Sequence, residues 1–350
     1  MMPNLPTRSL PLAAESVTPV SRKVGRRRLL LLAAALPLAA WRLNQTAEAA
    51  PLRWDGTALG APASLVLYHE GNTQRAQAAL SATLAEVARL EAMFSLFRAD
   101  SWLSRLNREG RITGAPGEFQ SLLGAALEMA AHSHGVFDPS IQPLWSLYFE
   151  HFVVGGHSQP PAPASVARAR ALVDWRGVHL AGTEVSLARA GMALSLNGIA
   201  QGFITDRCSA VLRQHGFSQM LVDMGEPRAL AAKPDGSAWT IGLADPREPS
   251  RAVHTLSVVD QAVATSGGYG TRLDAAGLFT HLINPHTGHT APASESVTVV
   301  APSATQADAL STALALMPST DTAARLALLR TQPGCRAICI NSSGQVSELS

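Results

Sequence analysis

The chain is 350 residues long, 47% of its residues are apolar and 15% are charged, and its formal net charge is +2. This length and apolar content exclude a disordered or fibrous protein and allow one large domain or two closely joined halves. Residues 1–49 contain seven basic and two acidic residues, which leaves 21 basic and 24 acidic residues, a net charge of −3, for the remainder. Because the basic excess lies in residues 1–49 and the remainder is slightly acidic, no nucleic-acid partner is expected. Lys233 is the only lysine after residue 49, so no lysine cluster is available for phosphates.

The N-terminal segment has the three parts of an export signal. A basic stretch ends in Arg26-Arg27-Arg28, an apolar run follows at 29–40, and Ala47-Glu48-Ala49 fits a small-residue cleavage site. The arginines favour the twin-arginine route to a bacterial periplasm, although an ordinary charged signal has similar residues. The apolar run is shorter than the roughly 20 residues of a membrane span, so an uncleaved inner-membrane anchor is the less favoured alternative. We therefore assign 1–49 to a signal peptide and 50–350 to one domain.

Hydrophobic periodicity and turn residues divide the domain into helices and strands. Helices are expected at 73–93, 119–131, 166–173 and 199–215, followed by two more near the C-terminus. Strands are expected around 66–68, 178–180, 193–196, 220–222, 238–243, 255–259, 278–283 and 297–301, with a strand pair at the end. A loop near 155–163 contains three prolines. Strands outnumber helices and short polar turns join many of them, so the sequence predicts an α+β fold rich in antiparallel sheet rather than a doubly wound one.

The three cysteines, Cys208, Cys335 and Cys339, are expected to be small buried residues. Cys335 and Cys339 lie in a sequence typical of a strand, where residues four apart are about 13 Å from each other, beyond disulfide reach. No spacing of cysteine and histidine indicates a zinc site.

The helix start expected at 305–314 carries Asp308 and Thr312, four residues apart, so that both side-chain oxygens point the same way. Such ligands suit a hard cation such as Mg²⁺, which keeps positions open for water and phosphate. Helix capping is the competing interpretation, because Thr305 and Asp308 have the spacing of a capping box. On these residues alone, capping is the favoured interpretation.

Two observations keep the metal interpretation open. Ser303 and Gln306 already supply a capping box of the S-x-x-Q type. The stripe expected to be buried consists of Ala307, Leu310, Leu314 and Met317. Asp308 and Thr312 lie outside this stripe, where they are available to a ligand.

Three further segments combine turns with groups that can contact a ligand. Residues 197–202, Asn-Gly-Ile-Ala-Gln-Gly, lie where a strand meets a helix, and their glycines let the backbone approach a ligand closely. Residues 263–269 have the composition of a small-residue turn that either binds an anion or only reverses the chain. His281, on an expected strand before a Pro/Gly turn, is a candidate general base near neutral pH. Each signal alone is weak, because a purely structural role is more common.

Taken together and in chain order, these segments resemble the ApbE family of FAD:protein FMN transferases. The matching segments are 94–107, 135–140, 197–202, 264–267, 281–288 and 308–312. Each match is short, but five or six of them in one order, over nearly the whole domain, rarely arise by accident.

The resemblance implies that FAD binds in a cleft between two subdomains and that Mg²⁺, or Mn²⁺, bridges its diphosphate. A Thr or Ser hydroxyl of an acceptor protein would attack the FMN phosphorus and release AMP. By motif position, Asp308, Thr312 and the Gly198 carbonyl would bind the metal, and His281 would act as the general base or position the substrate. The positions that would contact FAD are Leu59, Phe97, Val136, Phe137, Asp138, Gln201, Thr265, Ser266 and Ile283.

Several residues depart from the family pattern. Phe97 stands where tyrosine is frequent, Gln201 replaces a charged residue, and Asn284 replaces a frequent aspartate. Residues 225–228, Gly-Glu-Pro-Arg, differ from a frequent Gly-Gly-Asn segment. Two alternatives therefore stay open: a FAD pyrophosphatase with water as the nucleophile, and a non-catalytic periplasmic protein that binds or delivers flavin.

The resemblance also implies a D-x-x-[ST]-G-A-[ST] type of segment in the acceptor, which we expect to be a membrane-associated redox subunit. The nearest stretch in this chain, 110–116, lacks both the acidic residue and the final hydroxyl. We therefore expect the chain to modify another protein.

Overall fold

The computed structural model describes residues 51–58, 60–292 and 294–350. The predictions for residues 1–49 and for Leu59 lie outside this part. The α-helices are α1 (Thr73–Phe94), α2 (Trp102–Glu109), α3 (Gly117–His132), α4 (Gln142–Phe149), α5 (Pro163–Arg170), α6 (Ala200–Gln214), α7 (Ala304–Leu316) and α8 (Thr322–Arg330). Shorter helical turns are the π-helix η1 (Glu150–Val154) and the 3₁₀ turns η2 (Trp175–Gly177) and η3 (Gly268–Gly270). No helix in the described ranges is both long and apolar enough to cross a membrane.

The strands form one large sheet and two small ones. They are β1 (Pro51–Ala58), β2 (Ala61–Tyr68), β3 (Arg111–Ile112), β4 (Val178–Ala181), β5 (Glu184–Leu187), β6 (Met220–Asp223), β7 (Pro227–Leu230), β8 (Trp239–Asp245), β9 (Glu248–Val258), β10 (Ala262–Gly267), β11 (Ser296–Ala301), β12 (Arg336–Ile340) and β13 (Val346–Leu349). The large sheet has the order β1-β2-β6-β7-β10-β11-β12-β13, with antiparallel neighbours throughout. This confirms the predicted α+β fold rich in antiparallel sheet.

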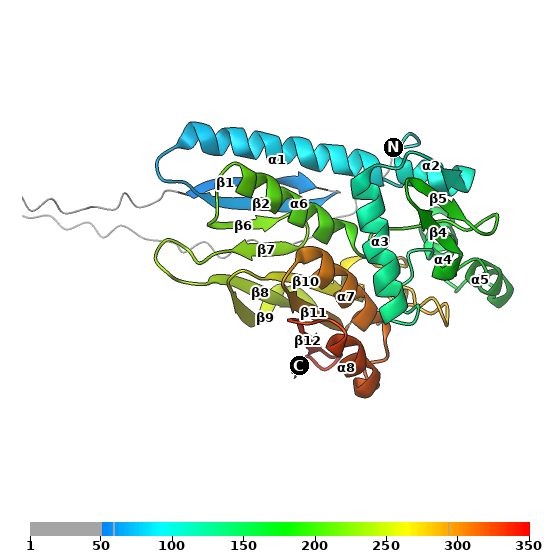
Figure 1. The fold of residues 1–350 in the computed structure, drawn as a ribbon. Coiled ribbons are helices and arrows are strands. Elements are labelled where there is room, and N and C mark those ends of the chain that lie inside the picture. The colour runs from blue at the N-terminus through cyan, green and yellow to red at the C-terminus, as the bar shows by residue number, and fades with distance from the viewer. Residues whose placement is uncertain (1–50, 59, 293) are drawn as a thin grey trace, which may run out of the picture.

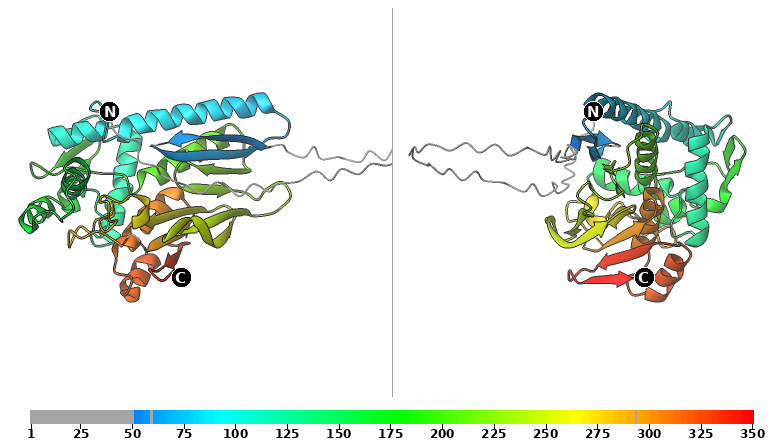
Figure 2. Two further views of the ribbon diagram at one scale, coloured as in Figure 1. Left: turned by 180° about the vertical axis from the view of Figure 1, so that it is seen from behind. Right: turned by 60° about the vertical axis from the view of Figure 1, so that its left-hand side comes forward.

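The large sheet is covered on both faces. Helices α1, α6 and α7 lie along one face, and the β8–β9 hairpin lies against the other (Figure 1 and Figure 2). Alternate side chains of a strand point to opposite faces, so Leu65 and Leu67 enter the main core under the helices, whereas Val66 packs with the hairpin. A third cluster of buried residues, around Leu144 and Tyr148, joins α4 and η1 to the loop before β11. The proline-rich stretch lies between η1 and α5, which starts at Pro163.

Helices α6 and α7 touch through their backbones at Gly202. A Cβ atom at this position would collide with the carbonyl oxygen of Ala304 and would lie 2.8 Å from the Cβ of Asp308. Only a residue without a side chain permits this approach. The glycine therefore fixes the distance between the two helices that later carry the candidate site.

The start of α7 is held by a side chain of α6. The carboxylate of Asp206 accepts hydrogen bonds from the amides of Ala304 and Thr305, each at 2.9 Å, and forms an ion pair with Arg228 of β7. These amides belong to the first turn of α7, where no intrahelical acceptor exists. Asp206 thus joins two helices and a strand at one point.

The strand expected at 193–196 is a loop. Both backbone groups of Leu194 are bonded to the side-chain amide of Asn107 in α2. The Asn107 Nδ2 donates to the Leu194 carbonyl at 2.9 Å, and the Leu194 amide donates to Asn107 Oδ1 at 2.7 Å. The side-chain amide of Asn107 therefore makes the two hydrogen bonds to Leu194 that a neighbouring strand would otherwise have made.

Two more expectations for the second half of the domain were wrong. Residues 278–283 form only isolated bridges, of Thr280 with Arg272 and of Ile283 with Thr290, and the amide of Phe279 donates to the side chain of Asp274 instead of to a neighbouring strand. Conversely, 263–269 is not a turn in its first part, since β10 occupies the middle of the large sheet beside β11. Small residues are needed there because α7 packs closely over this strand, where Ala264 is 1% exposed. The chain reverses only at η3.

All three cysteines are free thiols, as expected. Cys208 and Cys339 are buried, whereas Cys335 is only partly buried because it lies in the loop before β12. Burial raises the pKa of the Cys208 thiol to about 12. The expectation of small buried residues holds for two of the three.

Candidate active site

A cavity of about 840 Å³ opens between α1, α6, α7 and the end of β10 on one side and the segments before α2 and α4 on the other. It collects most of the residues predicted from the sequence. These are Phe97, Phe137, Asp138, Gly198, Gln201, Thr265, Ser266, His281, Ile283, Asp308 and Thr312. Val136 does not line it, and the cavity includes Gly60 and Ala61, which follow the undescribed Leu59.

Three oxygen-bearing groups meet at one end of the cavity. The Thr312 hydroxyl lies 3.5 Å from the Gly198 carbonyl oxygen, and a Cβ at Gly198 would lie 3.1 Å from that hydroxyl. The Asp308 carboxylate, one helical turn before Thr312, accepts a hydrogen bond from the Gly202 amide at 2.9 Å. The glycine turn before α6 therefore brings a carbonyl to the side-chain oxygens of α7.

The Asp308 carboxylate is buried without a cationic partner. Its residue is 4% exposed, and the ion pairs among the described residues do not include it. Burial, together with the nearby Asp206 carboxylate, raises the pKa of Asp308 well above its usual value. A buried carboxylate of this kind is stabilised by a bound cation.

A magnesium ion fits this donor set. No group of three or more His, Cys, Asp or Glu side chains suited to a metal occurs in the described part of the chain. The three groups at Gly198, Asp308 and Thr312 are instead a carbonyl, one carboxylate and a hydroxyl, and Mg²⁺ is usually held by one or two carboxylates while keeping several waters.

The structure does not use Asp308 as a helix cap. Ser303 caps α7 by accepting a hydrogen bond from the Gln306 amide at 3.2 Å, and the Thr305 hydroxyl donates to Asp206 rather than to Asp308. The prediction that Asp308 lies outside the buried surface of its helix was wrong, because α6 covers that side as well. It is buried, yet its carboxylate still borders the cavity.

The hydroxyl of Ser266 links β10 to α7. It lies 2.8 Å from the Ser311 hydroxyl and 3.2 Å from the Thr312 hydroxyl. Its neighbour Thr265 instead pairs its hydroxyl with Thr298 on β11 at 2.8 Å. Of these two predicted contacts, only Ser266 has a hydroxyl within hydrogen-bond distance of Thr312, one of the residues predicted to bind the metal.

His281 presents a neutral ring to the cavity. Its Nδ1 lies 3.2 Å from the Thr271 carbonyl oxygen, which can only accept, so Nδ1 carries the hydrogen and Nε2 keeps its lone pair. Burial lowers the pKa of His281 below its ordinary value, more than the hydrogen bond to Thr271 raises it. The ring can therefore accept a proton at Nε2 at neutral pH.

Aromatic rings also line the cavity, and Phe137 lies at the same end as Gly198, where a Cβ on that glycine would be 3.3 Å from the ring. Phe97 is 76% exposed and Phe137 is 4% exposed, and both border it. Asp138 does not point a free carboxylate at a ligand, because it accepts bonds from the Ser140 amide and hydroxyl and from the Trp175 amide. It holds the loop that places Phe137, and the rings offer flat apolar surface to a planar ligand.

The family model described as the ApbE family matches residues 59–339. The chain belongs to the ApbE family. Two curated relatives are named FAD:protein FMN transferase. The relative from Treponema pallidum is 32% identical over 302 residues, with 78% of this chain and 80% of that protein covered. The relative from Klebsiella pneumoniae is 30% identical over 264 residues, with 73% and 79% covered.

Solved structures show the same fold as this chain. The apo form of the flavinyl transferase ApbE from Pseudomonas stutzeri is 26% identical, with a TM-score of 0.72, and covers 86% of this chain and 95% of its own. The ApbE protein of Thermotoga maritima gives a TM-score of 0.74 at 24% identity, with 85% and 96% covered.

The cavity also contains residues that the sequence did not single out as contacts, among them Glu226, Tyr269 and Trp145. The pKa of Glu226 is raised well above its usual value by burial and by the carboxylates of Asp308 and Asp223. The departure at 225–228 from the family pattern was the available signal for Glu226. For Trp145, the corresponding signal is the group of aromatic residues that follows Pro143.

Because the pKa of His281 is lowered in the folded protein, the free energy of unfolding should depend on pH. Between the folded pKa and about 6.5, the unfolded chain binds a proton that the folded protein does not, so this contribution to the free energy of unfolding falls as pH drops through that range. We expect His281→Gln to lose less stability than the wild type between about pH 7 and about pH 5. Denaturant unfolding across this range measures the difference, and parallel curves for the two proteins would contradict the assignment.

Proposed function

We propose that this protein is an FAD:protein FMN transferase, which moves FMN from FAD to a Thr or Ser hydroxyl of an acceptor protein and releases AMP. The main observation in support of this activity is that one cavity brings together a buried unpaired carboxylate, neighbouring hydroxyl groups, a neutral histidine and aromatic rings. The names of the curated relatives support the same activity. The enzyme is therefore a transferase in this proposal, with FAD as its donor substrate.

Each group has a role that its chemistry supports. Asp308, Thr312 and the Gly198 carbonyl would hold Mg²⁺, or Mn²⁺, whose charge would balance that of a diphosphate. Phe97 and Phe137 provide apolar surface for a planar flavin ring. His281 would accept the proton of the acceptor hydroxyl at Nε2, because a hydroxyl is a weak nucleophile while it keeps its proton.

The proposed step balances as a phosphoryl transfer. The acceptor oxygen forms a bond to the FMN phosphorus, the diphosphate P–O bond breaks, and AMP leaves with that bridging oxygen. The hydroxyl proton passes to His281. In the alternative pyrophosphatase reaction, water takes the place of the acceptor hydroxyl and free FMN results.

Product analysis tests the proposal. The protein is incubated with FAD, Mg²⁺ and a peptide that contains a D-x-x-T-G-A-T segment, and the products are measured by mass spectrometry and chromatography. We expect covalent FMN–peptide and AMP in equal amounts, and no product when the metal is chelated. Free FMN without an adduct would indicate the pyrophosphatase, and unchanged FAD would indicate a non-catalytic flavin carrier.

We also propose that the protein acts in the periplasm, on a membrane-associated redox subunit. The composition of residues 1–49 supports export, and the absence of a full acceptor segment in this chain supports an external target. Cell fractionation of the full chain is the test, and recovery in the cytoplasm alone would contradict it.

A further inference from the structure

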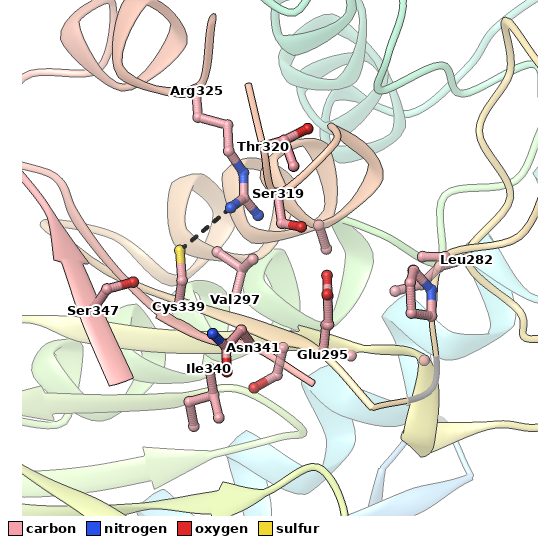
Figure 3. Close-up of a pocket in the computed structure, with 16 residues that line it drawn as sticks. Leu282, Glu295, Val297, Ser319, Thr320, Arg325, Cys339, Ile340, Asn341 and Ser347 are labelled. Atoms are coloured by element: carbon pink, nitrogen blue, oxygen red, sulfur yellow. Dashed lines mark hydrogen bonds between the residues drawn. The ribbon is translucent and has the colours of Figure 1, made fainter. Parts of the chain in front are cut away.

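A second, smaller cavity of about 200 Å³ adjoins the candidate active site (Figure 3). Gly267 and Leu282 border both cavities. Each of these residues directly follows a residue of the main cavity, Ser266 or His281. The wall between the two spaces is therefore thin at this point.

Arg325 of α8 brings an unpaired positive charge to the second cavity. The residue is 6% exposed, and its Nε and Nη2 both donate to the carbonyl of Leu314 in the last turn of α7, at 3.2 and 2.9 Å. Its Nη1 meets only the sulfur of Cys339 at 3.7 Å, a weak acceptor (Figure 3). No ion pair of the described residues includes Arg325. Its role as a cap for α7 thus leaves the charge uncompensated.

Ser296 adds a second unmet polar group on the same wall. It is 2% exposed, and its hydroxyl has no hydrogen-bond partner among the described residues. In the pairing of β10 with β11 it lies directly opposite Gly267, at the wall between the two cavities. Buried hydroxyls without partners are uncommon, because each one loses its hydrogen bonds to water.

Glu295 is the other charged residue that lines this cavity. It is less buried than Arg325, and no ion pair joins the two. The residues at the outer rim, Ser319, Thr320 and Ser347, are exposed and neutral. An incoming group therefore meets the partly buried carboxylate of Glu295 as well as one buried cation and one buried hydroxyl. The two buried groups are donors without a strong acceptor, and together they suit a carboxylate with its two acceptor oxygens.

We propose that the second cavity binds a carboxylate-bearing segment of the acceptor protein, with Arg325 and Ser296 as its donors. This inference rests on the proposed function, because it gives the second substrate of that reaction its binding site. A segment held there lies beside Gly267 and Leu282, so its neighbouring residues can reach the main cavity next to Ser266 and His281. The site would read an acidic side chain of the acceptor and thereby position the hydroxyl.

The first experiment measures binding rather than turnover. A fluorescein-labelled peptide with a D-x-x-T-G-A-T segment is titrated with protein, and its anisotropy gives Kd. Ser347→Trp places a large ring at the rim of the cavity, and we expect it to raise Kd at least tenfold. Ser342→Trp, on an exposed turn that does not line the cavity, is the matched control and should leave Kd unchanged. Both variants should bind FAD like the wild type.

The second experiment identifies the charge pair. Peptides in which each carboxylate is replaced in turn by its amide are titrated against the wild type and Arg325→Gln. We expect one amide peptide to bind the wild type about tenfold more weakly and to show no such difference with Arg325→Gln. Arg325→Gln also loses the hydrogen bonds to the Leu314 carbonyl at the end of α7, and it could unfold for that reason. Ser347→Trp leaves these bonds in place and still tests the cavity.

Several results would overturn the inference. These are a wild type that does not bind the peptide, equal Kd values for Ser347→Trp and Ser342→Trp, or no effect of any carboxylate. If Glu295→Gln weakens binding as much as Arg325→Gln does, Arg325 and Glu295 balance each other's charge. In that case Arg325 is not a free donor for the acceptor, and the proposal is wrong. Failure of the proposed function looks different, because the peptide would still bind in this manner but no FMN would be transferred.

Discussion

Asp308→Asn should lower Mg²⁺-dependent FMN transfer by about 10³-fold while the protein stays folded. The asparagine keeps the shape of the side chain and an oxygen that can accept from the Gly202 amide, as Asp308 does at 2.9 Å. What it removes is the negative charge, which is buried without a cationic partner among the described residues. Because a buried unpaired charge is costly in the metal-free protein, Asp308→Asn should melt at or above the wild-type temperature.

The measurement is the initial rate of adduct formation over a range of Mg²⁺ concentrations, together with thermal unfolding with and without the metal. Mg²⁺ should raise the melting temperature of the wild type and leave that of Asp308→Asn nearly unchanged. Asp235→Asn, which alters an exposed loop carboxylate, is the control and should behave like the wild type. A variant that keeps full activity at low Mg²⁺ would exclude Asp308 as a ligand.

Gly202→Ala should destabilise the protein by about 3 kcal/mol and abolish most of its activity. The added methyl group would collide with the Ala304 carbonyl oxygen and would lie 2.8 Å from the Asp308 Cβ. These are backbone atoms and the first atom of a side chain, so neither can swing away. Helix α7 must move, and the hydrogen bond from the Gly202 amide to Asp308 must lengthen.

Thermal unfolding should show a melting temperature lowered by about 5–10 °C. Gly124→Ala is the matched control, since Gly124 lies within α3 and a Cβ there would have its nearest neighbour at 4.0 Å. Alanine favours a helix over glycine, so this control should be unchanged or more stable by about 0.5–1 kcal/mol. Equal melting temperatures for the two variants would mean that α6 and α7 do not depend on this contact.

The parts of the fold that could be predicted are those with a long, regular pattern. The helix expected at 73–93 occurs as Thr73–Phe94, and that expected at 199–215 occurs as Ala200–Gln214. The failures arise where a side chain replaces a strand, as Asn107 does for Leu194, or where tertiary contacts select small residues, as α7 does over β10. No local sequence pattern records either cause.

The sequence predicted the membership of the candidate site better than its geometry. Most of the predicted residues line one cavity, since the matching segments lie on the ends of strands and helices that meet there. The role of Asp138 could not be predicted, because its carboxylate is bonded to the Ser140 and Trp175 backbone rather than exposed to a ligand. Nor could the burial of Asp308, which depends on a helix that starts about a hundred residues earlier in the chain.

The contacts of the Asp206 carboxylate also bear on how the protein unfolds locally. It binds the first amides of α7 and the guanidinium of Arg228, so separating any one of these pieces leaves the others with unmet charge or unmet N–H groups. Helices α6 and α7, which both border the candidate site, are therefore expected to open and close as one cooperative unit. A chain that reaches its destination already folded would keep the candidate site intact. Local unfolding around Asp206 would disrupt α6 and α7 together, and with them the candidate site.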